Sequence, residues 1–124
     1  MLNLDTHILI HAMAGTLEPA EEKALRSDRW GISAIVLWEI AKLAQLGRIE
    51  IDLSDPDVER FLTHIHTWPL SLPVVRTLPI LDFRSDPADE LIAATSVVHN
   101  APLLTRDRRI LRSKVVPLVK ISRR

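Results

Sequence analysis

Acidic side chains stand at several places along the chain where a carboxylate can do chemistry. Asp5 directly follows an apolar run at the N-terminus, and Asp107 follows another near the C-terminus. Glu39 lies inside the strongly apolar segment 34–46, and Asp89 lies near the start of an alanine-rich segment. A carboxylate in apolar surroundings is costly unless it is paired or binds a cation. The residue types therefore favour a cation site.

Carboxylates that converge on one place need a partner of opposite charge. Two of them about 4 Å apart repel by about 4 kcal/mol at an effective dielectric constant of 20, so a cluster takes up protons or a cation. Hard oxygen ligands, without thiolates and without a clear His cluster, favour Mg²⁺ or Mn²⁺ over Zn²⁺. Such ions polarise a phosphoryl oxygen and activate water, which is the chemistry of phosphodiester hydrolysis.

Each of these acids also has a structural explanation. Asp5 and Asp107 each precede a predicted helix, where a short carboxylate caps free N–H groups and complements the helix dipole. In the sequence DPAD, Asp86 is a predicted N-cap, and Asp89 is placed to complete a capping box. For Asp86 capping is the favoured interpretation.

The positions of Asp89 and Glu39 weaken a purely structural explanation. Asp89 shares a helical face with the small or apolar residues three, four and seven positions later, so it points toward packed structure. Glu39 has the alternative of a solvated helix face shared with Lys42, and the sequence leaves that alternative open.

Strands and helices are predicted to alternate along the whole chain. We predict strands at 1–4, 30–32, 70–72, 102–105 and 115–119, and helices at 6–13, 19–27, 34–46, 56–68, 74–81, 87–99 and 108–111. Pro117 would place the last strand at the sheet edge. This alternation predicts a single α/β domain over residues 1–124 with a central parallel sheet. In such a sheet a site lies beyond the carboxyl ends of the strands, where Asp5 and Asp107 fall.

Composition excludes several classes of protein. The 124 residues contain 16 Lys and Arg and 16 Asp and Glu, so net charge indicates no partner, although residues 106–124 are strongly basic. The chain has no Cys, which excludes disulfides and thiolate sites and fits a reducing compartment. No apolar run reaches the ~20 residues that cross a bilayer, and the N-terminus lacks the pattern of a signal peptide. We expect a soluble cytoplasmic protein.

Four segments carry a family resemblance. LNLDTH at 2–7, SAIVLWEIA at 33–41, DPADELIAAT at 86–95 and LLTRD at 103–107 resemble, in order, the four motifs of PIN-domain ribonucleases, specifically the VapC-type toxins of bacterial toxin–antitoxin pairs. The resemblance implies a PIN-like fold, with a central parallel sheet flanked by helices. It also implies Mg²⁺-dependent endoribonuclease activity, a VapB-like antitoxin partner and a homodimer.

The resemblance also assigns residues. It places catalytic and metal-binding roles on the acidic positions of the motifs, foremost the first and third: Asp5, Glu39, Asp89 and Asp107. Neighbouring polar residues would orient water, carboxylates or substrate: Thr6, Ser33, Thr105 and Asp86. The sequence departs from many relatives at Glu90, where they place an Arg after the third acid.

On this interpretation water activated by Mg²⁺, or by Mn²⁺, attacks an RNA phosphodiester in line. Arg106, Arg108 and Arg109 are candidates for contacts with RNA phosphates, and a solvated face or an antitoxin-binding edge would explain them equally well. None of the five His residues is assigned to catalysis. His64 and His66 are placed in one helix.

Two other functions stay open at this point. A receiver-like Mg²⁺-binding phosphotransfer switch is also acidic and α/β, but it needs adjacent acids after its first strand, and here Thr6 follows Asp5. A noncatalytic PIN domain that binds RNA or protein is the second alternative, and retention of all four acids argues against it.

The antitoxin hypothesis can be made specific. An amphipathic antitoxin helix would bury its apolar face between segments 34–46 and 58–68, and an antitoxin Arg would enter the acidic pocket. Glu21 and Glu22, in a helix expected to be solvated, should contribute little to that association.

Overall fold

A four-stranded parallel sheet forms the centre of the protein in the computed structural model, which describes residues 1–121. The strands are β1 (Leu2–Leu4), β2 (Trp30–Ser33), β3 (His66–Trp68) and β4 (Leu103–Leu104), in the order β3-β2-β1-β4. The predicted α/β class with a parallel sheet is confirmed. The last three residues of the predicted basic tail lie outside the described range.

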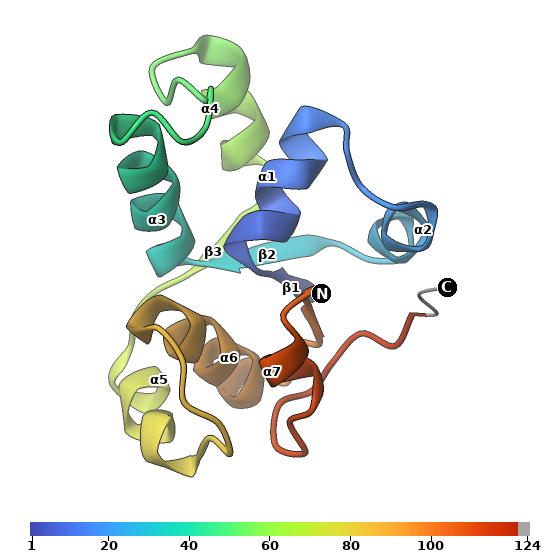
Figure 1. Cartoon of the computed structure of the whole chain (residues 1–124), viewed down its shortest axis with the longest axis vertical. Helices are drawn as coiled ribbons and strands as arrows, with labels where there is room; N and C mark the ends of the chain where they lie inside the picture. Colours follow the sequence, from blue (N-terminus) through green and yellow to red (C-terminus); the bar gives the residue numbers. More distant parts are fainter. Residues whose placement is uncertain (122–124) are drawn as a thin grey trace.

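Helices lie on both sides of this sheet. They are α1 (Thr6–Ala14), α2 (Pro19–Arg26), α3 (Ala34–Gln45), α4 (Pro56–Thr63), α5 (Leu72–Thr77), α6 (Pro87–His99) and α7 (Arg108–Leu111), with a 3-10 helix η1 (Leu78–Ile80). Figure 1 shows the sheet running across the middle, with α1, α3 and α4 above it and α5, α6 and α7 below. Within residues 1–121, no helix has the length and apolar character needed to cross a membrane.

Strand β1 is fixed at the centre of the fold by burial and by one polar side chain. Leu2, Asn3 and Leu4 are all buried. The Asn3 side-chain amide donates to the Ile92 carbonyl at 3.0 Å and to Ser96 Oγ at 2.8 Å, and both acceptors lie on α6. Because Asp5 follows β1 and Asp89 lies on α6, these hydrogen bonds fix the two acidic segments relative to each other.

The third strand is not where the sequence predicted it. The predicted helix 56–68 ends at Thr63, and the predicted strand 70–72 is absent, because residues 66–68 form β3 instead. Thr67 and Trp68 pair with β2, which satisfies backbone groups that an open sheet edge would leave unpaired. His64 and His66 are therefore not in one helix. His64 caps α4, and His66 lies in β3.

The elements around two prolines are also shorter than predicted. The predicted helix 74–81 begins earlier, with Ser71 as the N-cap of α5, and becomes the 3-10 helix η1 at Leu78, next to Pro79. The predicted strand 115–119 is reduced to one parallel bridge between Leu103 and Leu118, beside β4 at the edge of the sheet. Pro117 has no N–H to donate, so pairing does not extend through it.

Gly31 leaves space for the ring of Trp68. A Cβ atom at Gly31 would lie 2.5 Å from two Trp68 ring atoms. The Trp68 ring also stacks on the His99 ring, with the ring centroids 5.4 Å apart. We predict that Gly31→Ala lowers the free energy of unfolding by about 1–3 kcal/mol through overpacking, as measured by urea denaturation.

The same substitution made together with Trp68→Leu is the control. Because Leu is smaller than Trp and leaves room for the added methyl group, Gly31→Ala should then lower the free energy of unfolding much less than it does alone. An unchanged cost in the double variant would contradict the assigned steric cause.

Candidate active site

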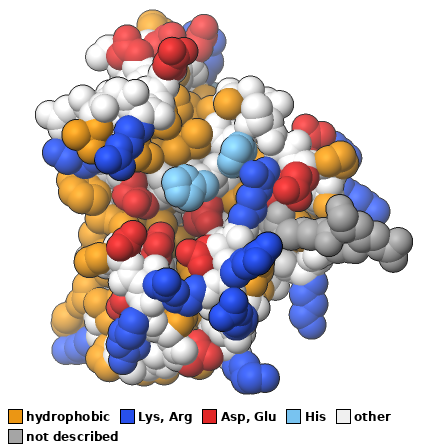
Figure 2. Space-filling model, in the orientation of Figure 1, with side chains coloured by type: hydrophobic (Ala, Val, Ile, Leu, Met, Phe, Trp, Pro, Cys, Tyr) orange, Lys and Arg blue, Asp and Glu red, His pale blue; other side chains and the backbone are white. Residues whose placement is uncertain are grey.

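The four predicted acids line one cavity. This acid cavity has a volume of about 260 Å³ and is bordered by Asp5, Thr6, His7, Glu39, Asp89, Arg106 and Asp107. Asp5 follows β1, Asp107 follows the β4 region, Glu39 lies on α3, and Asp89 lies in the first turn of α6. Figure 2 shows acidic side chains gathered near the middle of this face, with His side chains above them and Lys and Arg below and beside them.

Asp5 is a helix cap and a cavity residue at once. Its Oδ1 accepts a hydrogen bond from the Ile8 N–H at 2.8 Å, which caps α1, and the residue is 8% exposed. Burial raises the pKa of Asp5, while hydrogen bonds with the Thr105 side chain and the Ile8 backbone act to lower this pKa. The predicted capping role is thus confirmed, and the cap holds the carboxylate at the cavity.

Glu39 is half-buried and faces the same cavity. It accepts a hydrogen bond from the Thr6 hydroxyl. Burial raises the pKa of Glu39, and the charges of Asp89 and Asp5 raise it further. Lys42 is exposed and donates to Gln45 Oε1 at 2.9 Å, whereas Glu39 is half-buried at the cavity, so the two side chains do not share a solvated face.

Asp89 is held by a residue that the sequence analysis missed. Its Oδ2 accepts from the Ser85 hydroxyl at 2.9 Å. Burial raises the pKa of Asp89, and the charges of Asp107 and Asp86 add to this effect. The only signal for Ser85 in the sequence is its place next to the Asp-Pro that begins α6.

The predicted capping box at α6 is wrong. Asp86 occupies the N-cap position, but its side chain accepts no capping bond, is exposed, and does not line the acid cavity. Glu90 Oε2 accepts from the Ser85 N–H at 2.9 Å, so the residue that replaces the usual Arg fixes the backbone before α6. Asp89 instead accepts from the Ser85 hydroxyl and faces the cavity.

Asp107 and the two remaining polar residues are held by backbone contacts. Asp107 Oδ1 caps α7 through the Arg109 N–H at 2.8 Å, and the Asp107 N–H donates to Thr105 Oγ1 at 3.0 Å. Thr105 therefore connects Asp107 with Asp5. Ser33 is the buried N-cap of α3, accepting from the Ile35 N–H at 3.3 Å, and it does not line the acid cavity.

His7 is a cavity residue that the sequence analysis did not assign to the site. It is exposed and lies on α1 two residues after Asp5. Burial is the largest influence on the pKa values of Asp5, Glu39 and Asp89 and raises them, and the charge of His7 acts in the opposite direction on all three. The available signal was its position in the first turn of the helix that Asp5 caps.

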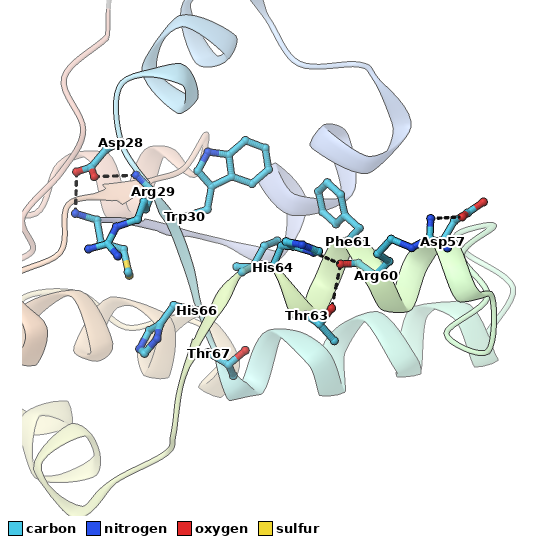
Figure 3. A pocket seen from close by; sticks show the side chains of 12 residues that line it. Asp28, Arg29, Trp30, Asp57, Arg60, Phe61, Thr63, His64, His66 and Thr67 are labelled. Atoms are coloured by element: carbon cyan, nitrogen blue, oxygen red, sulfur yellow. Dashed lines mark hydrogen bonds and ion pairs between the residues drawn. The ribbon is translucent and has the colours of Figure 1, made fainter.

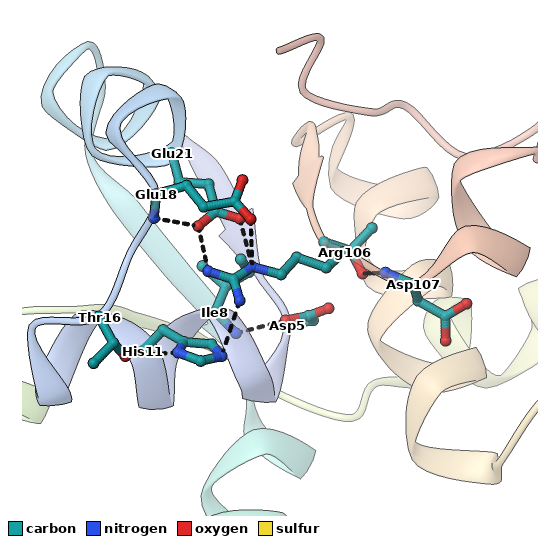
Figure 4. A network of polar contacts seen from close by, with 9 residues as sticks. Asp5, Ile8, His11, Thr16, Glu18, Glu21, Arg106 and Asp107 are labelled. Carbon is teal, nitrogen blue, oxygen red and sulfur yellow. Dashed lines mark hydrogen bonds and ion pairs between the residues drawn. The ribbon is translucent and has the colours of Figure 1, made fainter. Parts of the chain in front are cut away.

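Arg106 is not the free arginine that the sequence suggested. It lines the acid cavity, but its guanidinium binds the Glu21 carboxylate, with Nε to Oε2 at 2.7 Å and Nη2 to Oε1 at 2.6 Å (Figure 4). Glu21 was expected on a solvated helix and is fully buried, so that expectation is wrong. Arg108 and Arg109 are exposed on α7.

The donor set fits a hard divalent cation. Four carboxylates from separate elements face one small cavity, and burial raises the pKa of three of them, because burial disfavours the charged form. Over residues 1–121, no three His, Asp or Glu groups are already close enough to hold one ion together. Each carboxylate accepts a hydrogen bond from a neighbouring hydroxyl or N–H group, and its oxygen chemistry suits Mg²⁺ or Mn²⁺.

A larger hollow lies at the other end of the strands. It measures about 970 Å³ and is bordered by Trp30 and Phe61, whose rings pack edge to face with centroids 6.0 Å apart (Figure 3). Its two acids are already paired: Asp28 with the N-terminal amine at 2.7 Å and Asp57 with Arg60 at 3.0 Å. The unpaired carboxylates are thus in the smaller cavity, at the carboxyl end of the sheet where parallel folds place their sites.

Comparison with known proteins decides the family. The model of the PIN domain matches residues 3–115. This chain belongs to the PIN-domain family. The PIN domain described here is 32% identical to Ribonuclease VapC22 of Mycobacterium tuberculosis over 113 residues, covering 86% of this chain and 87% of that protein. The predicted VapC-type resemblance is confirmed, and the receiver-like alternative is set aside.

Solved structures share the fold of this PIN domain. VapBC2 from Rickettsia felis, bound to a DNA fragment from its promoter, has a TM-score of 0.73 at 20% identity and covers 96% of this chain and 98% of its own. A toxin–antitoxin complex from Klebsiella pneumoniae has a TM-score of 0.70 at 19% identity, with coverage of 90% and 92%. At these identities the likeness concerns the fold.

The raised pKa of Glu39 has a consequence for stability. Because the folded state holds this proton more tightly than the unfolded state, ionisation of Glu39 destabilises the fold above the unfolded pKa of about 4.3. We predict that Glu39→Gln raises the free energy of unfolding at pH 7 by up to ~1 kcal/mol, allowing for solvent screening, and that the gain disappears near pH 4.

Urea denaturation in EDTA at both pH values measures this difference. Glu50→Gln is the matched control, because Glu50 is exposed and should show no gain at either pH. A Glu39→Gln protein that is less stable than wild type at pH 7 would show that the carboxylate is not repelled in the cavity.

Proposed function

We propose that this PIN domain is a metal-dependent endoribonuclease, the toxin of a VapBC-type toxin–antitoxin system. The observation that carries the proposal is the meeting of Asp5, Glu39, Asp89 and Asp107 in one cavity with too little positive charge to neutralise them. The name of the relative, Ribonuclease VapC22, supports RNA as the substrate.

The contacts of the four acids suggest a role for each in binding a metal ion. Asp5 and Asp89 would hold Mg²⁺ or Mn²⁺, and Glu39 and Asp107 would complete the acid cavity directly or through water. When bound, the ion supplies Lewis-acid polarisation of a phosphoryl oxygen and of water.

Hydroxyl groups would keep the carboxylates in place during this chemistry. Thr6 orients Glu39, Ser85 orients Asp89, and Thr105 orients both Asp5 and Asp107. Arg108 and Arg109 are exposed on α7 beside Asp107, and in this proposal they would contact RNA phosphates. Arg106 does not share this role in our proposal, since Glu21 engages its guanidinium.

Removal of one ligand tests the catalytic proposal. Asp5→Asn and Asp89→Asn should each lower Mg²⁺-dependent RNA cleavage at least about 100-fold, because ligands of one ion act as a unit. Asn still caps a helix, so α1 should remain folded in the Asp5 variant. The measurement is cleavage of a labelled RNA with and without EDTA.

Asp57→Asn, at an exposed position outside the acid cavity, is the matched control and should retain wild-type activity. Full activity of a folded Asp5→Asn protein would overturn the assignment. Absence of cleavage by the wild type under all metal conditions would favour the alternative of a noncatalytic PIN domain that binds RNA or protein.

We also propose a VapB-like antitoxin and a homodimer as the protein partners. Similarity to chains in VapBC complexes supports the antitoxin. Exposed apolar side chains on and after α3, Trp38 at 56% and Leu46 at 61%, offer area for association with another protein surface. An Arg of the antitoxin would enter the acid cavity and form a charge-assisted pair with Asp5 or Asp89.

Antitoxin titration tests that contact. Asp89→Asn should weaken binding of the cognate antitoxin about tenfold or more at matched salt, because a charge-assisted bond is lost. Glu22→Gln, exposed on α2, is the control and should bind as wild type does. Glu21 cannot serve as a control, because it is buried. Equal affinity of Asp89→Asn and wild type would refute a direct contact between Asp89 and an antitoxin Arg.

A further inference from the structure

One arginine stands beside the carboxylates without neutralising them. Of the residues that border the acid cavity in the described chain, Arg106 is the only Lys or Arg. It directly precedes Asp107. Hydrogen bonding with Glu21 does most to raise the pKa of Arg106, and the Asp5 charge adds to this effect. An arginine so placed is a natural counter-ion for the acids, yet its guanidinium is bound elsewhere.

A buried glutamate holds that guanidinium. Both Glu21 oxygens accept from Arg106, at 2.7 and 2.6 Å, in the two-bond geometry that best fixes an arginine. Glu21 is itself fully buried, and its Oε1 also accepts from the Glu18 N–H at 2.9 Å, which fixes the carboxylate to the start of α2. Helix α2 therefore presents a rigid acceptor to Arg106.

Further groups keep the arginine on the α2 side. His11 Nε2 lies 3.2 Å from Arg106 Nη1, and Glu18 Oε1 lies 3.9 Å from Nε. His11 is positioned in turn by Thr16, with Nδ1 2.7 Å from the hydroxyl oxygen. Figure 4 shows the guanidinium turned toward Glu21 and His11, with Asp107 on the other side of the Arg106 backbone.

We propose that Glu21 is a positioning residue that holds the Arg106 guanidinium out of the acid cavity and so keeps the carboxylates available to a divalent cation. Without Glu21, the same flexible side chain would pair with Asp5 or Asp107, and its positive charge would oppose cation binding. This inference rests on the proposed metal-dependent function.

A merely structural ion pair makes a different prediction. If the Glu21–Arg106 pair only stabilised the loop 105–107, then losing either partner would disturb the cavity in the same direction. If Glu21 restrains Arg106, then loss of Glu21 weakens cation binding, and additional loss of Arg106 restores it. The two explanations therefore differ in whether the additional loss of Arg106 strengthens or further weakens cation binding.

Calorimetric titration of Mn²⁺ into the folded protein measures the Kd of each variant. Glu21→Gln should raise the Kd about tenfold, because Gln is a weaker acceptor for the guanidinium and Arg106 becomes free to reach the acids. The double variant Glu21→Gln/Arg106→Gln should return to the wild-type Kd or below it. It leaves no buried charge unpaired, unlike Arg106→Gln alone, which is expected to fold poorly. Glu22→Gln, on the exposed face of α2, should bind as wild type does.

Two results would overturn the inference: a wild-type Kd in Glu21→Gln, or a double variant as weak as Glu21→Gln. A crystal structure of metal-free Glu21→Gln gives a readout that does not depend on the metal. Arg106 found against the cavity carboxylates supports the restraint, and Arg106 still bound to Gln at position 21 overturns it. If wild type binds no Mn²⁺, the proposed metal-dependent function fails, and this structure still decides the inference.

Discussion

The burial of several carboxylates in one cavity is the constraint on which the arrangement of this protein depends. Four acids from separate segments face one small cavity, and burial raises the pKa of Asp5, Glu39 and Asp89. Folding therefore has to hold together groups that would separate in water. The core supplies that force: Leu4, Ile8, Ile40 and other fully buried side chains pack around the strands and helices that carry the acids.

The polar contacts around the cavity do two tasks at once. Asp5 and Asp107 cap α1 and α7, so the bonds that begin each helix also fix the direction of a carboxylate. The Asn3 amide ties β1 to α6 and thereby sets the segment of Asp5 against that of Asp89. A structural explanation and a functional one are thus not alternatives here, because the same hydrogen bonds satisfy helix ends and position the site.

The local spacing of apolar residues predicted most helices and strands correctly. It was misleading where pairing with a segment distant in sequence decided the structure. Alternation of apolar runs and helical spacing predicted the parallel sheet, and the helix predicted over 34–46 is α3. Apolar spacing from Val58 to Ile65 also suggested a helix through Trp68, but residues 66–68 pair with β2 and close over Gly31. Strand pairing depends on a partner distant in sequence, which a local window does not contain.

The sequence by itself determined the α/β class and the four motifs. The geometry of parallel strands pointed to Asp5 and Asp107, and the family resemblance added Glu39 and Asp89 to the acids that line the cavity. Only the tertiary structure decided which charges are neutralised. Glu21 looked like a solvated residue of a polar helix, and Arg106 like a free basic residue, until folding brought positions 85 residues apart within 2.6 Å. Charge pairing falls off steeply with distance and with exposure to water, so it is set by the packing of α2 against the loop after β4 and not by composition.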